Sequence, residues 1–199
     1  ALLDAIEGGA VQSGALNANQ RDQLKKTKDE ALRARADKLF ASATPGDRQK
    51  AYEEAKACLA LKPAPANGRE VFKRACAQCH RLDREGVAVG PDLFDIRHQP
   101  KESILLHLVI PEAEINPNFT SYVCETKDGR TLTGVLVADT PANITLRQGQ
   151  GLEDTIARAN IVRLEASALS LMPQELEKSV TAQELADLLA FLKGEASGE

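Results

Sequence analysis

Two cysteines and a histidine stand in one short run, Cys76-Ala77-Gln78-Cys79-His80, and this run constrains the chain more than any other feature. Two thiols spaced in this way on a helical turn can reach the two vinyl groups on one edge of a haem and form thioethers, which leaves the adjacent imidazole over the iron. The run therefore predicts one covalently attached haem c, bound through Cys76 and Cys79 and with His80 as the proximal iron ligand.

Other uses of paired cysteines fit this chain less well. A zinc site would need a second pair of ligands, and the sequence has no further C-x-x-C and no H-x-x-x-H. A thioredoxin-like redox pair is expected after a strand. Here the preceding residues predict a helix that Asn67 can cap, with Val71, Phe72 and Ala75 as its apolar positions.

Composition narrows the class of protein further. The chain has 199 residues, of which 43% are hydrophobic and 27% charged, which excludes collagenous and disordered classes. The apolar stretch 104–110 is too short to span a bilayer or act as a secretion signal, so no transmembrane segment is expected in this chain. The net charge is −4 and basic residues do not cluster, so no nucleic-acid partner is expected.

The segments after the haem motif resemble the class I cytochromes c. Gly90-Pro91-Asp92-Leu93 stands where these proteins carry a Gly-Pro-x-Leu turn. The resemblance implies that the carbonyl oxygen of Pro91 accepts the Nδ1 proton of His80, a bond that fixes the tautomer of a ligand histidine and raises its basicity. An ordinary turn is the alternative for an isolated Gly-Pro pair.

The single methionine of the chain, Met172, lies shortly before a second predicted helix. That helix opens with the capping box Thr181 to Glu184 and continues with leucines at helical spacing. In cytochromes c the loop of the ligand methionine likewise precedes the C-terminal helix, which packs across the N-terminal one. The resemblance therefore implies that Met172 is the distal iron ligand, and this pairing with imidazole raises a haem potential and suits electron transfer.

Other interpretations of the sixth iron position remain open. A lone methionine is usually core filler. His98 lies in a loop that could reach the iron, His107 lies between leucines on a predicted helix, and Cys124 lies within a β pattern. An open sixth position is the remaining alternative.

Residues 1–66 predict an α-helical segment. One helix has the apolar stripe Leu32, Ala36, Leu39 and Phe40, and a second begins with Thr44 as N-cap and Pro45 and extends to about Leu61. The proline-rich run 62–66 breaks the helix and predicts a domain boundary, so that residues 67–199 form the haem domain.

The segment between His80 and Met172 is several dozen residues longer than in a compact class I domain. A β insert at about 119–165 accounts for the difference. It is expected to contain a hairpin around an Asp-Gly turn and up to three further strands, with the ranges 120–126, 131–137, 143–147, 153–156 and 161–164. We therefore expect a mainly α, cytochrome c-like haem domain with a small, strongly bent antiparallel insert that is separable from the haem fold.

The order of motifs resembles, more specifically, a haem-binding domain family found at the C-termini of large secreted proteins of planctomycete-type bacteria. The matching positions lie between residues 67 and 193 and comprise 68–72, 76–80, 89–93, 110–115, Tyr122, 127–130, Gly134, 170–173 and 185–188. The resemblance implies that residues 1–66 are the end of a helical repeat region. It also implies a periplasmic or otherwise exported protein.

The function expected from these features is electron transfer by one haem c. The domain would accept electrons from a fused or docked dehydrogenase and pass them to a respiratory carrier, and no catalytic residues are needed for this. The alternative is a haem sensor or peroxidase-like enzyme with an open or labile sixth site. Cys58 and Cys124 remain after haem attachment, and the sequence leaves open whether they form a disulfide or stay buried thiols.

Overall fold

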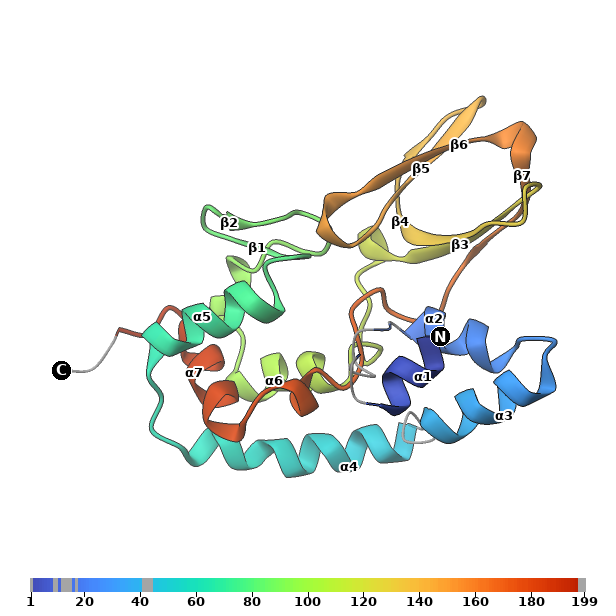
Figure 1. Cartoon of the computed structure of the whole chain (residues 1–199). Helices are drawn as coiled ribbons and strands as arrows, with labels where there is room; N and C mark the ends of the chain where they lie inside the picture. Colours follow the sequence, from blue (N-terminus) through green and yellow to red (C-terminus); the bar gives the residue numbers. More distant parts are fainter. Residues whose placement is uncertain (1, 9–10, 12–15, 17, 41–44, 197–199) are drawn as a thin grey trace.

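The computed structural model describes residues 2–8, 11, 16, 18–40 and 45–196, with helices in one part and a curved sheet in another (Figure 1). The helices are α1 (Leu2–Glu7), α2 (Ala18–Lys25), α3 (Glu30–Leu39), α4 (Pro45–Ala55), α5 (Pro65–Ala75), α6 (Lys101–Val109) and α7 (Ala182–Leu192). No helix among the described residues has both the length and the apolar character needed to cross a membrane.

Helices α5 and α7 cross in close contact and build the core of the haem domain. The crossing is tight at Gly68, where a Cβ atom would lie 2.0 Å from the backbone oxygen of Asp187. One turn further along, the rings of Phe72 and Phe191 lie 5.6 Å apart, centroid to centroid. The capping box predicted at Thr181 and Glu184 is present at the start of α7.

The start of α5 differs from the expectation that Asn67 caps it. The helix begins at Pro65, and its N-cap residue Ala64 makes no side-chain cap bond. Instead, the backbone N–H of Ala64 donates to the buried carboxylate of Asp187, 2.7 Å away on α7. Proline suits the first helical position because its φ is preset and it has no N–H to satisfy, so the helix starts three residues earlier than predicted.

The second half of the N-terminal segment shares its core with the haem domain. Helix α4 continues into η3 (Lys56–Ala60), where Cys58 is fully buried in one cluster with residues of α5, α6 and α7. The hydroxyl of Tyr52 also donates to the backbone oxygen of Glu102 on α6, at 3.2 Å. The boundary at residue 66 stays a prediction, and the hydrophobic core continues across it. The expected N-cap Thr44 lies outside the described residues.

Helices α1 to α3 form a smaller cluster of their own, which buries Leu3, Ile6, Leu16, Ala36 and Phe40. The predicted stripe of α3 is only partly right, because Leu32 remains 39% exposed.

The β insert forms a five-stranded antiparallel sheet in the order β6-β5-β4-β3-β7. Its strands are β3 (Ser121–Thr126), β4 (Thr131–Asp139), β5 (Asn143–Arg147), β6 (Glu153–Ala157) and β7 (Ile161–Ala166), close to the predicted ranges. Register shifts in the β3–β7 and β4–β5 pairs mark β-bulges, which bend strands. The sheet has its own hydrophobic cluster around Cys124, Ile144, Leu146 and Ile156. The description mainly α is therefore only partly right.

The structure also answers the question about the spare cysteines. Cys58 and Cys124 are both buried and free, and they lie in different hydrophobic clusters. The disulfide alternative is not formed.

A larger side chain at the helix crossing should destabilise the fold. In Gly68→Ala the new Cβ would overlap backbone atoms of α7, and such overpacking typically costs about 1–3 kcal/mol of the free energy of unfolding. Gly46→Ala is the matched control in α4, because nothing lies within 4 Å of its Cβ position; its expected effect is zero or a gain of up to about 1 kcal/mol. Urea denaturation measures both. Equal effects would show that the crossing is not tight.

Candidate haem-binding site

One cavity of about 950 Å³ brings together all five site residues predicted from the sequence, Cys76, Cys79, His80, Pro91 and Met172. Its volume lies near the top of the range of roughly 300–1,000 Å³ usual for small-molecule and cofactor sites. The walls come from the end of α5, from α6, from the loop around Pro91, from the loop around Met172 and from β4.

The haem motif forms a tight turn directly after α5. Cys76 is the C-cap of the helix, and its carbonyl oxygen accepts backbone N–H groups of Cys79 at 3.0 Å and His80 at 2.9 Å. Burial raises the pKa of the Cys76 thiol to about 12. Burial also raises the pKa of Cys79, although a backbone hydrogen bond from Gln150 opposes this shift. Both side chains are therefore neutral thiols facing the cavity at neutral pH.

His80 is held from its Nδ1 side. This atom lies 2.8 Å from the carbonyl oxygen of Pro91, the contact expected from the Gly-Pro turn. Burial lowers the pKa of the imidazole, so the ring is neutral at neutral pH and Nδ1 carries the proton that Pro91 accepts. Nε2 is then left with a lone pair, as an iron ligand requires.

Two glycines let the backbone approach His80. A Cβ at Gly90 would lie 2.6 Å from the ring atom Cε1, and a Cβ at Gly86 would lie 2.0 Å from the backbone oxygen of His80. Gly86 belongs to a short hairpin that the sequence did not predict, formed by β1 (Arg81–Leu82) and β2 (Glu85–Gly86). The imidazole is therefore fixed both by a hydrogen bond and by close backbone contact.

Met172 lies in a loop that is tied to the sheet at its start. The hydroxyl of Ser121 on β3 donates to the backbone oxygen of Leu169 at 2.7 Å. The backbone N–H of Met172 donates to the hydroxyl of Ser170 at 3.1 Å. The Met172 side chain is partly buried and packs against the helical core.

The β insert contributes to the wall of the cavity and contacts the haem motif, and its separability from the haem fold stays a prediction. Val135 of β4 lines the cavity. The turn η6 (Gly149–Gly151) rests on the haem motif, where the backbone N–H of Gln150 donates to the oxygen of Gln78 at 2.9 Å. Arg147 also donates from Nη1 to the backbone oxygen of Ala88 at 3.0 Å. The sequence signals the strands of the insert but gives no sign of these long-range contacts.

The alternative sixth ligands occupy different places. His107 of α6 lines the cavity. His98 is exposed at the end of η4 (Asp95–His98), and Cys124 is enclosed in the hydrophobic cluster of the sheet.

These residues fit a haem c. The cavity is large enough, two neutral thiols and a neutral imidazole face it from one turn, and a thioether lies on a second loop. Crossed helices that enclose such a donor set define a c-type cytochrome domain.

Comparison with known proteins agrees with this class. Residues 65–115 match the family model of cytochrome c. A cytochrome c-553-like protein of Synechocystis sp. is 33% identical over 66 residues, which cover 30% of this chain and 62% of that protein. A cytochrome c homolog of Rickettsia bellii is 48% identical over 46 residues, which cover 22% of this chain and 26% of that protein. The chain thus spans less than two thirds of the length of these curated relatives.

Residues 65–115 thus match a cytochrome c domain, and a domain of this kind implies a covalently bound haem c.

A methyl group at Gly90 should disturb the proximal side of this site. Gly90→Ala would bring a Cβ into the ring of His80, so we expect a lower yield of holoprotein and an altered Soret band. Gly149→Ala is the control, because its Cβ would make only an ordinary contact, 3.9 Å from Sγ of Cys79. Absorption spectra normalised to protein concentration measure both variants. A normal spectrum for Gly90→Ala would show that the close contact with His80 has no role.

Proposed function

We propose that this domain carries one haem c on Cys76 and Cys79, with His80 and Met172 as axial ligands of the iron, and transfers single electrons. The observation that carries the proposal is the bond from Nδ1 of His80 to Pro91, which leaves Nε2 as the metal-binding atom in a cavity that Met172 also lines. When bound, the haem supplies a reversible one-electron couple at its iron.

The residues of the chain have separable roles in this proposal. Pro91 fixes the orientation of the imidazole, and hydrogen bonding at Nδ1 raises the basicity of Nε2. Met172 supplies a soft thioether, which favours ferrous iron and so raises the reduction potential. The buried side chains of Ile104, Leu108 and Leu192 line the same cavity and exclude water from it.

The partner and the place of action are also proposed. A donor dehydrogenase, fused or docked, and a respiratory acceptor are the partners that suit a domain with a single one-electron centre. An exported, periplasmic location is supported by the covalent haem, which is attached on the oxidising side of the membrane. The order of motifs supports membership in the planctomycete-type family, in which the domain ends a larger secreted protein.

Covalent attachment gives the first test. Acid-acetone extraction of the holoprotein should leave the colour with the polypeptide, because the haem is bound through thioethers. The double variant with Cys76→Ala and Cys79→Ala should yield no stable coloured protein. Cys58→Ala is a matched control, because this cysteine is buried outside the cavity and should leave attachment intact. Complete transfer of wild-type haem to the organic phase would contradict the proposal.

The sixth ligand gives the second test. Met172→Ala should abolish the weak charge-transfer band at the red end of the oxidised spectrum and lower the potential by a substantial part of the ~0.8 V range that axial ligands control. His107→Ala, which also changes a cavity-lining residue, should retain the band.

Two results would argue against Met172 as the ligand. A change of the band in His107→Ala but not in Met172→Ala would reassign the sixth position. Ready binding of carbon monoxide to the reduced wild-type protein, with no such band, would favour a sensor or peroxidase-like enzyme.

A further inference from the structure

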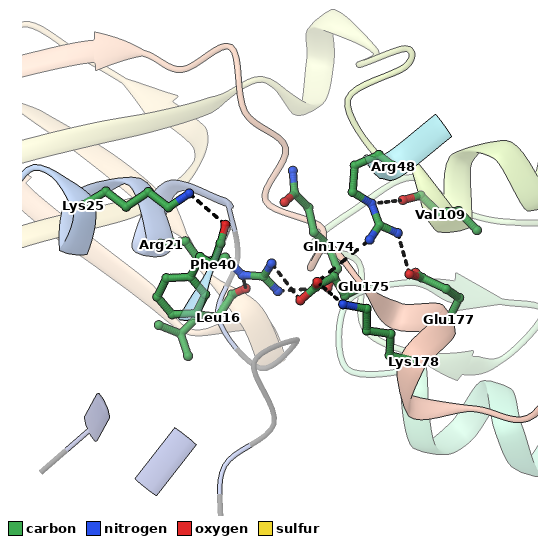
Figure 2. Close-up of polar contacts among 10 residues, drawn as sticks. All are labelled: Leu16, Arg21, Lys25, Phe40, Arg48, Val109, Gln174, Glu175, Glu177 and Lys178. Atoms are coloured by element: carbon green, nitrogen blue, oxygen red, sulfur yellow. Dashed lines mark hydrogen bonds and ion pairs between the residues drawn. The ribbon is translucent and has the colours of Figure 1, made fainter. Parts of the chain in front are cut away.

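A group of charged side chains is buried directly behind the loop of Met172. The carboxylate side of this group is Glu175 and Glu177, which follow Met172 in the chain. The opposite side consists of Arg21 from α2 and Arg48 from α4. Figure 2 shows the two arginines approaching the loop from different directions and meeting near Glu175.

Arg21 joins the N-terminal helices to this loop. Its Nη1 lies 3.0 Å from Oε2 of Glu175, and both side chains are only 3% exposed. Its Nη2 donates to the backbone oxygen of Gln174 at 3.2 Å. On the other side, Nε donates to the backbone oxygen of Leu16 at 3.0 Å, and the guanidinium lies 5.5 Å from the ring centroid of Phe40. Arg21 is thus fixed within its own segment and presents two contacts to the loop.

Arg48 makes a parallel connection from α4. Its Nη2 lies 2.5 Å from Oε1 of Glu177, and its Nε donates to the backbone oxygen of Val109 at 3.3 Å. Its Nη1 is 4.0 Å from Glu175, whose carboxylate also pairs with Lys178 at 2.5 Å. The loop behind Met172 is therefore bonded to α2 and to α4, and Arg48 also ties α4 to the end of α6.

These contacts constrain where the loop can lie. Buried charges are costly when they lose their partners, so Glu175 and Glu177 stay close to the two guanidinium groups. Glu175 also has a positive φ of 65°, a backbone conformation that costs free energy for a residue with a side chain and persists only where surrounding contacts fix it. Only two residues separate Glu175 from Met172. A shift of Glu175 would therefore displace the thioether.

We propose that Arg21 and Arg48 are positioning residues for the sixth iron ligand. The two arginines hold Glu175 and Glu177 against α2 and α4. The packing of these helices therefore sets the fraction of molecules in which the sulfur of Met172 is bonded to the iron. The N-terminal helical segment then influences both the access of external ligands to the iron and the reduction potential of the haem. This inference rests on the proposed function, in which Met172 is the ligand.

The test measures iron ligation in the haem-loaded full chain. Arg21→Met removes the guanidinium contacts to Gln174 and Glu175 and keeps a long unbranched side chain in their place. We expect a weaker charge-transfer band and a lower reduction potential. We also expect imidazole to bind the ferric protein about tenfold more tightly, because a tenfold larger fraction of molecules with an open sixth position raises the apparent affinity by the same factor.

Arg35→Met is the matched control. Arg35 belongs to the same N-terminal segment, but it is more exposed and pairs with Asp4 at 2.5 Å and Glu7 at 2.7 Å on α1. These contacts of Arg35 lie on α1 and not on the loop of Met172, so its replacement should leave imidazole affinity unchanged. The double variant Arg21→Met with Glu175→Gln removes both charges of the pair, and it replaces the single variant if that protein does not fold.

A measurement on the wild type needs no variant. Coupling between two sites is reciprocal, so imidazole, which displaces Met172, should in turn raise the amide hydrogen-exchange rates of α2 and α4. Unchanged exchange rates in these helices would overturn the proposal. It would also be overturned if the variants lost stability but kept the imidazole affinity and the reduction potential of the wild type, because the arginines would then be purely structural contacts. A different result would contradict the proposed function itself. If Met172→Ala bound imidazole no more tightly than the wild type, Met172 would not be the sixth ligand.

Discussion

The close crossing of α5 and α7 is the contact on which the haem site depends. Gly68 lets the two backbones touch, and Asp187 of α7 supplies the cap that α5 lacks in its own sequence. Because Cys76 is the C-cap of α5 and α7 follows the loop of Met172, this crossing fixes the proximal and distal sides of the cavity relative to each other. The spacing of the ligands is thus a property of helix packing rather than of the loops alone.

Both neutral and charged side chains line the cavity. The groups assigned to the haem are neutral: burial keeps the thiols of Cys76 and Cys79 protonated and the imidazole of His80 uncharged. The buried charges gather on one side of the cavity, where Arg21 and Arg48 meet Glu175, which also lines the cavity, and Glu177. These ion pairs tie the loop of Met172 to the rest of the fold, because a buried charge is costly without its partner.

Local patterns in the sequence predicted the parts of the molecule that depend on neighbouring residues. Two β-rich runs joined by the Asp-Gly turn, where Gly129 has a φ of 83°, predicted the hairpin of β3 and β4. The resemblance of Gly90-Pro91-Asp92-Leu93 to the Gly-Pro-x-Leu turn of class I cytochromes c implied the hydrogen bond between His80 and Pro91.

What the sequence could not predict are contacts between distant residues. Arg21 and Gln174, which hydrogen-bond, are 153 positions apart, and no periodicity connects a charged residue of one helix with a backbone oxygen of a far loop. The same reason explains the missed contact of Gln150 with the haem motif and the wrong cap for α5. Whether Cys58 and Cys124 pair was equally a question of distance in space, which the fold decides by placing them in separate clusters.

The central claim is that Met172 binds the iron opposite His80, and nuclear magnetic resonance of the reduced protein tests it most directly. Met172 is the only methionine in the sequence, so labelling with methyl-¹³C methionine gives a single signal to follow in this chain. A methyl group bonded to an iron-ligating sulfur lies over the haem ring, and the ring current shifts its resonance far upfield. The account predicts this upfield signal. A methyl resonance at the position of an ordinary methionine side chain would contradict it.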